Sequence, residues 1–191
     1  GMGCDLQRNV RAQAEDVAGV LNHIASQPWA DRSRILAVGH IHGGMTALEL
    51  AASGYPGVRG VLNFAGGWRH SECGTWQYDL TRTLEEQARA TKVPSLWFYA
   101  SNDSYMGEFA RPMFEKYTAA GGKARFVNFG SFQNDGSFMF VSDAGAPLWE
   151  PEVTSFLQSL GLPSETVPQL AHHGVVAPRP AKTNFADINE V

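Results

Sequence analysis

The chain has 191 residues, 43% of them hydrophobic and 18% charged, with a formal net charge of −4. This is the composition of one ordinary globular domain with a hydrophobic core. The 15 Lys and Arg residues are scattered, which argues against a nucleic-acid surface, and no run approaches the roughly 18 apolar residues of a membrane span. Two cysteines, Cys4 and Cys73, allow at most one disulfide, and no basic-then-apolar leader is visible. We therefore expect a reducing compartment, the cytoplasm.

Apolar runs too short for helices alternate along the chain with amphipathic segments. The first amphipathic segment is a helix whose predicted apolar stripe consists of Val10, Val17, Val20, Leu21 and Ile24. In chain order, the pattern predicts helix 6–26, strand 34–39, helix 45–52, strand 58–64, helix 80–90, strand 95–100, helix 108–120, strand 124–129 and helix 152–160, the last with Pro151 in its first turn.

This alternation predicts the α/β class, with a mainly parallel sheet of about four strands and helices on both faces. We expect the domain to occupy residues 1–161. Residues 162–191 carry several prolines and few large apolar residues, which predicts an extended C-terminal tail. The long connection 66–79 is rich in Trp, Gly and polar residues, and loops of that length are often functional.

The residues Gly39-His-Ile-His-Gly-Gly44 connect the first predicted strand to the next helix. A G-x-S-x-G sequence in this context is a nucleophile elbow, in which the central residue adopts a positive φ on a sharp turn. Here the central residue is Ile41, and a β-branched residue at positive φ is a costly outlier. We predict that the elbow nevertheless survives, because Gly39 and Gly43 still let strand and helix pack closely.

Three patterns together resemble the C-terminal part of dienelactone-hydrolase-type α/β-hydrolases. They are the elbow, the strand end Trp97-Phe-Tyr-Ala-Ser-Asn-Asp103, and Phe132-Gln-Asn-Asp-Gly-Ser137. The resemblance implies a partial α/β-hydrolase fold and places the triad acid at Asp103. It also implies that the triad histidine position is Ser137 and that one oxyanion N–H belongs to His42.

The triad positions have lost two of their three groups. Ile41 has neither a lone pair nor a proton for nucleophilic attack, and Ser137 cannot act as a base near neutral pH. The family strands that precede the elbow strand, and their oxyanion loop, have no counterpart in the chain. We therefore predict a hydrolase-derived protein without triad catalysis, which requires no cofactor. The alternative is an active hydrolase on small esters or lactones.

Several interpretations of the polar and aromatic residues stay open. Asp103 is either an orphaned triad acid or a helix cap, and His40, His42 and Asp103 are the candidate ligands of a metal-dependent alternative. A reactive Cys–His pair of Cys73 and His70 is a further hypothesis. A small-molecule ligand would contact His40, Trp68 and Tyr105. The aromatic residues that either line such a pocket or simply cover the core are Trp68, Trp76, Trp97 and Tyr105.

Without preceding strands, strand 34–39 would lie at the edge of the sheet. A long apolar edge strand promotes association. We expect a homodimer along this edge, or coverage by the C-terminal tail.

Overall fold

The computed structural model describes residues 4–164. Nearly all of the predicted tail, from residue 165 onward, lies outside the described residues, as does any contact of that tail with the sheet edge. No helix in the described range is long and apolar enough to cross a membrane.

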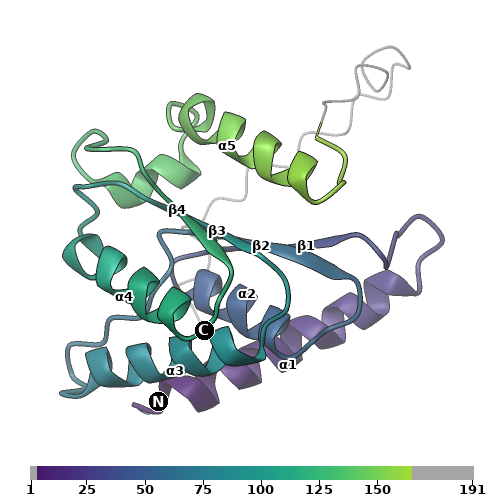
Figure 1. Cartoon of the computed structure of the whole chain (residues 1–191), viewed down its shortest axis with the longest axis horizontal. Helices are drawn as coiled ribbons and strands as arrows, with labels where there is room; N and C mark the ends of the chain where they lie inside the picture. Colours follow the sequence, from purple (N-terminus) through teal and green to yellow (C-terminus); the bar gives the residue numbers. More distant parts are fainter. Residues whose placement is uncertain (1–3, 165–191) are drawn as a thin grey trace, which may run out of the picture.

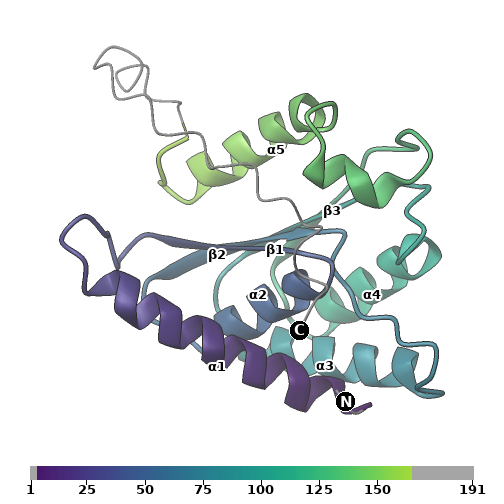
Figure 2. The same ribbon diagram turned by 180° about the vertical axis from the view of Figure 1, so that it is seen from behind.

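Four parallel strands form one sheet in the order β1-β2-β3-β4. Helices α1 to α4 lie on one face of this sheet, whereas η1 and α5 lie on the other (Figures 1 and 2). The elements are α1 (Leu6–Ala25), β1 (Ile35–His40), α2 (His42–Ala52), β2 (Val58–Phe64), α3 (Trp76–Ala90), β3 (Ser95–Tyr99), α4 (Gly107–Ala119), β4 (Ala124–Asn128), η1 (Gly136–Val141) and α5 (Ala146–Ser159). The predicted α/β architecture with helices on both faces is confirmed.

Both faces of the central strands are buried, which explains their continuous apolar sequences. Alternate residues of a strand point to opposite faces. Val61 and Trp97 therefore belong to the larger core beneath helices α1 to α4. Their neighbours Leu62 and Leu96 belong to a second core, which Phe156 of α5 closes.

Three predicted helix starts are late. Helix α2 begins at His42 rather than at residue 45, and α3 begins at Trp76 rather than at residue 80. Helix α5 begins at Ala146 with Pro147 in its first turn, so that Pro151 lies inside the helix. Pro147 thus has the role predicted for Pro151, because a missing N–H costs nothing in a first turn.

The predicted stripe of α1 is only partly correct. Leu6, Val10 and Ala14 are buried, but Val17 is 38% exposed and Val20 is 60% exposed. The C-terminal half of α1 lies beside the edge strand β1, where no further element of the described chain covers it (Figure 2). The start of the helix, in contrast, contacts α3 through Gln7 and Arg11. The helix also packs against α2.

Strand β1 forms an edge of the sheet, as predicted, because its only strand partner within residues 4–164 is β2. Val38 on this edge is 56% exposed. A largely apolar hollow of about 500 Å³ lies between α1, β1 and α2, and its wall includes Val17, Leu21 and Val38.

Cys4 and Cys73 form a disulfide that joins the start of α1 to the loop after β2, with 5.6 Å between the Cα atoms. The small cysteine count led to the expectation of a reducing compartment. A disulfide persists in oxidising compartments instead, so the cysteines do not support that expectation.

Candidate functional site

The turn after β1 has the elbow conformation, with Ile41 at φ 54° and ψ −119°. Three backbone hydrogen bonds hold the residue: its N–H donates to Phe64 O (3.1 Å), and its carbonyl accepts from Gly44 N (3.0 Å) and Gly67 N (3.2 Å). A residue in a sparsely populated region persists only where its surroundings determine it in this way. The prediction that the elbow survives the isoleucine is confirmed.

Glycine is required at two positions of the elbow. A Cβ on Gly39 would lie 1.9 Å from Gly43 O, and one on Gly44 would lie 2.1 Å from Asn63 Oδ1. A Cβ on Gly43 would meet nothing within 4 Å. Gly39 thus has its predicted role, but Gly44 rather than Gly43 is the second glycine that close packing needs.

We expect Gly39→Ala to lower the free energy of unfolding by about 1–3 kcal/mol or more. This is the usual cost of overpacking, and it arises because the strand and helix backbones must separate. The matched variant Gly43→Ala adds the same methyl group to open space. It should be neutral or stabilising by up to about 1 kcal/mol, since alanine favours helix. Urea denaturation of both variants checks this pair, and equal losses of stability would contradict the packing argument.

Asp103 lies at the carboxyl end of β3 and is 6% exposed. Its Oδ1 accepts from the N–H groups of Tyr105 (2.8 Å) and Met106 (2.9 Å), which stabilises the turn before α4. Its Oδ2 is buried and has no hydrogen-bond partner in the part of the chain that is described. Asp103 thus closes the turn before α4 but does not cap the helix, whose N-cap residue Met106 has no side-chain cap hydrogen bond. The other alternative from sequence, an orphaned triad acid, stays a prediction.

Ser137 lies on η1 and is 7% exposed. Its neighbour Gly136 is pressed against the end of β3, since a Cβ there would lie 2.3 Å from Ala100 Cβ and 3.1 Å from Asp103 N. On the other side, the Ser137 carbonyl lies 3.1 Å from His40 Nε2. The nucleophile, acid and histidine positions of the resemblance therefore meet at one corner of the sheet.

Asp135 is a site residue that the motif analysis missed. Its carboxylate accepts from the Ser104 hydroxyl and N–H, and from the Ser137 N–H, so it joins the loops after β3 and β4. These hydrogen bonds, that of the Ser104 hydroxyl foremost, lower the pKa of Asp135 to about 2. The signal in the sequence was the pair Asp135-Gly136, because an Asp side chain readily accepts a hydrogen bond from the backbone N–H two residues later.

The two elbow histidines point to different neighbours. His40 contacts Ser137 O and the Phe140 ring, with 6.4 Å between ring centroids, and so helps to position η1. His42 Nε2 lies 2.8 Å from the Tyr105 hydroxyl, which itself accepts from Arg69 N. The Tyr105 proton is thus free to donate to His42, which requires a neutral imidazole with an unprotonated Nε2.

Burial, and to a lesser extent the neighbouring His70, lower the pKa of His42 below the ordinary value of a histidine. A histidine whose pKa is lower in the folded state than in the unfolded state stabilises the protein above its unfolded pKa. That stabilisation is lost as the pH falls through the folded pKa. We therefore expect the NMR titration midpoint of His42 to lie below about 6.5, the ordinary value of a histidine. A His42 midpoint at or above about 6.5, the pKa of an unperturbed histidine, would contradict the neutral His42–Tyr105 pair.

The remaining candidate residues lie in different surroundings. Trp68 and Trp97 are buried in the larger core, whereas Tyr105 is half-buried beside His42. Cys73 is in the disulfide, so the reactive Cys–His hypothesis is wrong for this state of the protein. Within residues 4–164, no group of at least three His, Cys, Asp or Glu side chains is placed to hold a metal ion.

Solved structures with this fold include several hydrolases. The chain is 19% identical to a putative dienelactone hydrolase from Klebsiella pneumoniae subsp. pneumoniae MGH 78578, with a TM-score of 0.55 over 78% of this chain and 61% of that one. It is 14% identical to an acylaminoacyl peptidase of Pyrococcus horikoshii, with a TM-score of 0.55 over 73% of this chain and 26% of that one. It is also 14% identical to a variant of Arabidopsis thaliana SOBER1, with a TM-score of 0.55 over 81% of this chain and 65% of that one.

These likenesses show the α/β-hydrolase fold, and the chain spans less than two thirds of the length of each of these proteins. No curated protein matches the chain. The family model of the dienelactone hydrolase family matches residues 3–160. Because that match covers most of the sequence, the chain belongs to the dienelactone hydrolase family.

Proposed function

We propose that this member of the dienelactone hydrolase family does not perform triad catalysis and instead binds a small molecule at the corner of the sheet where η1 lies against the carboxyl ends of β1 and β3. The observation that carries the proposal is Ile41, which occupies the strained central position of the elbow at φ 54°. The backbone presents a side chain there as a nucleophile elbow does, but that side chain is a hydrocarbon.

Acyl transfer needs an attacking oxygen or sulfur, a base within hydrogen-bond reach of it, and an acid that orients the base. Ile41 supplies no attacking atom. Ser137 supplies no base, and the Oδ2 atom of Asp103 has no imidazole to orient among the described residues. In subtilisin, loss of the nucleophile alone lowers turnover by about a millionfold.

The ligand would meet both apolar and polar groups at this corner. Phe138 and Val141 of η1 are 60% and 63% exposed, so one short element offers two large apolar side chains to a ligand. The His42–Tyr105 pair adds polar groups that can fix the orientation of a ligand. This combination of apolar surface and few placed polar groups is typical of small-molecule sites.

Hydrolysis of p-nitrophenyl acetate by the purified protein tests the proposal. We expect turnover at the background rate, unchanged by Asp103→Asn, which keeps an oxygen to accept from the N–H groups of Tyr105 and Met106. Asp143→Asn, on an exposed loop, is the matched control. Turnover that Asp103→Asn abolishes would support the alternative, an active hydrolase on small esters or lactones. Turnover that a chelator abolishes would support the metal-dependent alternative.

We also propose that a second copy of the chain covers the edge strand β1. The exposed Val38 and the apolar hollow beside it support this proposal, since native proteins cover apolar edges. We expect a dimer in sedimentation equilibrium and a monomer for Val38→Lys. A monomeric wild type would contradict the proposal.

A further inference from the structure

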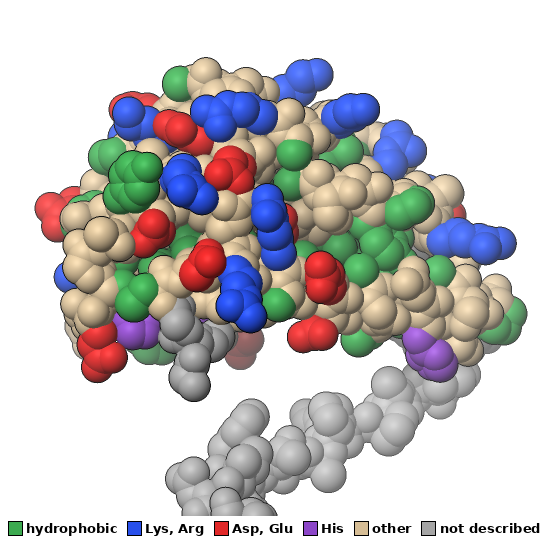
Figure 3. Space-filling view, turned by 90° about the horizontal axis from the view of Figure 1, so that it is seen from below, with side chains coloured by type: hydrophobic (Ala, Val, Ile, Leu, Met, Phe, Trp, Pro, Cys, Tyr) green, Lys and Arg blue, Asp and Glu red, His purple; other side chains and the backbone are tan. Residues whose placement is uncertain are grey.

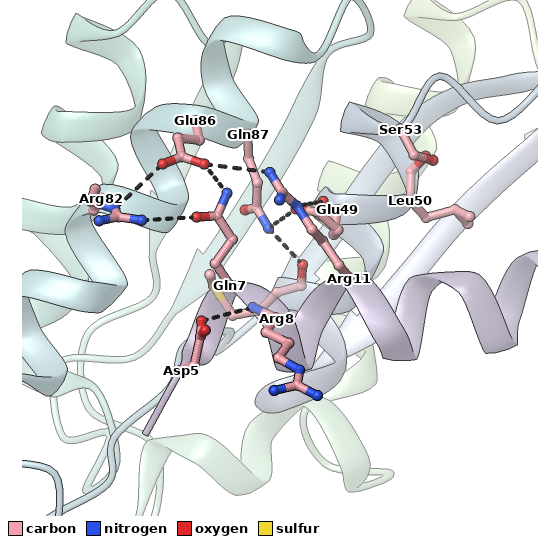
Figure 4. A network of polar contacts seen from close by, with 11 residues as sticks. Asp5, Gln7, Arg8, Arg11, Glu49, Leu50, Ser53, Arg82, Glu86 and Gln87 are labelled. Carbon is pink, nitrogen blue, oxygen red and sulfur yellow. Dashed lines mark hydrogen bonds and ion pairs between the residues drawn. The ribbon is translucent and has the colours of Figure 1, made fainter. Parts of the chain in front are cut away.

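A second candidate site lies in the helical layer, formed by residues other than those of the elbow. Helices α1, α2 and α3 enclose a hollow of about 370 Å³. Figure 4 shows how the polar side chains of the three helices converge there. On the surface of the helical layer, acidic and basic side chains are interspersed and form no large patch of a single charge (Figure 3). The hollow is therefore a local feature and not part of a charged face.

Glu49 is the buried acid of this hollow and is 8% exposed. Its Oε1 lies 3.5 Å from Arg11 Nε, and its Oε2 accepts from Gln87 Nε2 at 2.9 Å. An ionised carboxylate in such a place requires a cation and hydrogen-bond donors nearby. Within the described part of the chain, the guanidinium of Arg11 is the cation that faces it.

Gln87 contributes a hydrogen-bond acceptor without a donor. Its side chain is 2% exposed, and its Nε2 donates to Glu49 and to Met45 O. Gln87 is one of the residues that line the hollow, and its Oε1 is buried without a partner among the described residues. Buried acceptors without a donor are rare and costly, so an N–H group that reached this oxygen after a small rearrangement would be stabilising.

Arg11 holds its position only loosely. Its side chain is 58% exposed, and its contacts with Glu49 and with Glu86 both measure 3.5 Å. The exposed pair with Glu86 contributes little free energy, whereas loss of the pair with the buried Glu49 is costly unless another cation replaces Arg11. A cation that enters the hollow and pairs with Glu49 can therefore displace Arg11 outward and reach Gln87.

The charges and walls of the hollow favour a cation with a short hydrocarbon chain. Its lining, as formed by residues 4–164, contains the carboxylates of Glu15, Glu49 and Glu86 but only one cation, Arg11, while Arg82 pairs with Glu86 from outside the lining. The remaining wall is largely alanine: Ala14, Ala18, Ala52 and Ala90. Small apolar side chains leave room for methylene groups between the helices.

We propose that this hollow binds a small organic cation, a primary ammonium or guanidinium group on a short alkyl chain. Its N–H groups donate to Gln87 Oε1 and to Glu49, and its methylene groups pack on the alanines. Arg11 occupies the entrance in the absence of the cation and moves outward when the cation binds.

Calorimetric titration with agmatine, which carries a guanidinium and an ammonium on a butyl chain, tests the proposal. Butan-1-ol and butyrate serve as neutral and anionic controls of the same chain length. We expect saturable binding of agmatine and none of the controls. Arg11→Met should tighten agmatine binding by about tenfold if Arg11 fills the entrance nine-tenths of the time. Arg59→Met, an exposed residue outside the lining, should leave binding unchanged.

Loss of charge inside the hollow should weaken binding. Glu49→Gln should abolish the calorimetric signal, and Glu15→Gln at the exposed rim, which is safe for folding, should weaken it by a smaller factor. The proposal is overturned if neither the wild type nor Arg11→Met prefers agmatine to butan-1-ol. Weaker binding by Arg11→Met would overturn the role of Arg11 as a displaceable cation.

Discussion

The double variant Ile41→Ser, Ser137→His is expected to hydrolyse p-nitrophenyl acetate at least about a hundredfold faster than Ile41→Ser alone, because positioned general bases typically contribute 10²–10⁴. The elbow already holds residue 41 at φ 54°, so a serine there is presented without backbone rearrangement. The Asp103 Oδ2 atom, which has no partner among the described residues, becomes the acceptor for the new imidazole. Steady-state kinetics of the purified variants measure the gain.

The same variant with Asp103→Asn is the control for the restored triad. It should lose most of the gained activity, since an amide cannot hold the imidazole in the tautomer that accepts the serine proton. Circular dichroism establishes that each variant is folded. A folded double variant with only background turnover would show that the corner lacks more than the two triad side chains. The hydrogen-bond donors of an oxyanion hole would then be the first missing group to test for.

Removal of the Cys4–Cys73 disulfide is expected to destabilise the protein by about 4 kcal/mol on the loop-closure model, within the 2–5 kcal/mol typical of native disulfides. The two cysteines are 69 residues apart in the sequence, so the bond excludes many conformations of the unfolded chain. Denaturant unfolding with and without a thiol reductant measures the change.

Two variants separate the cross-link from side-chain packing. Cys73 is 2% exposed and belongs to the larger core, whereas Cys4 is exposed. Cys4→Ser therefore removes the bond with little loss of packing, and we expect it to match the reduced wild type. Cys73→Ser should cost more, because it also places a hydroxyl in the core. Equal stability of oxidised and reduced wild type would contradict the disulfide.

The sheet was predictable because its strands are buried on both faces. A continuous apolar sequence such as that of β3, flanked by amphipathic helices, is typical of a strand inside a parallel sheet. The helix starts were less predictable, since α2 begins at His42 within the elbow motif and α3 begins inside a loop-like sequence. In both cases tertiary packing extends a helix through residues of weak propensity.

The corner itself was predictable from three short motifs, but its contacts were not. The motif order placed Ile41, Asp103 and Ser137 together. In the structure the His40 side chain contacts the Ser137 carbonyl, and Gly136 packs against Ala100 and Asp103. The bonds of Asp135 to Ser104 and of His42 to Tyr105 join residues 31 and 63 positions apart. No periodic pattern in the sequence predicts contacts between residues so far apart. Trp68 was a predicted ligand contact, yet it is buried in the core, because an aromatic residue in a loop has the same sequence signature in either role.

Covalent labelling with a fluorophosphonate probe tests most directly whether the protein, with Ile41 at the elbow, lacks a catalytic nucleophile. Intact-mass measurement of the wild type should show no adduct, whereas Ile41→Ser, Ser137→His should gain one at residue 41. A stoichiometric adduct on the wild type, mapped by peptide analysis to any side chain around Ile41, would contradict the account.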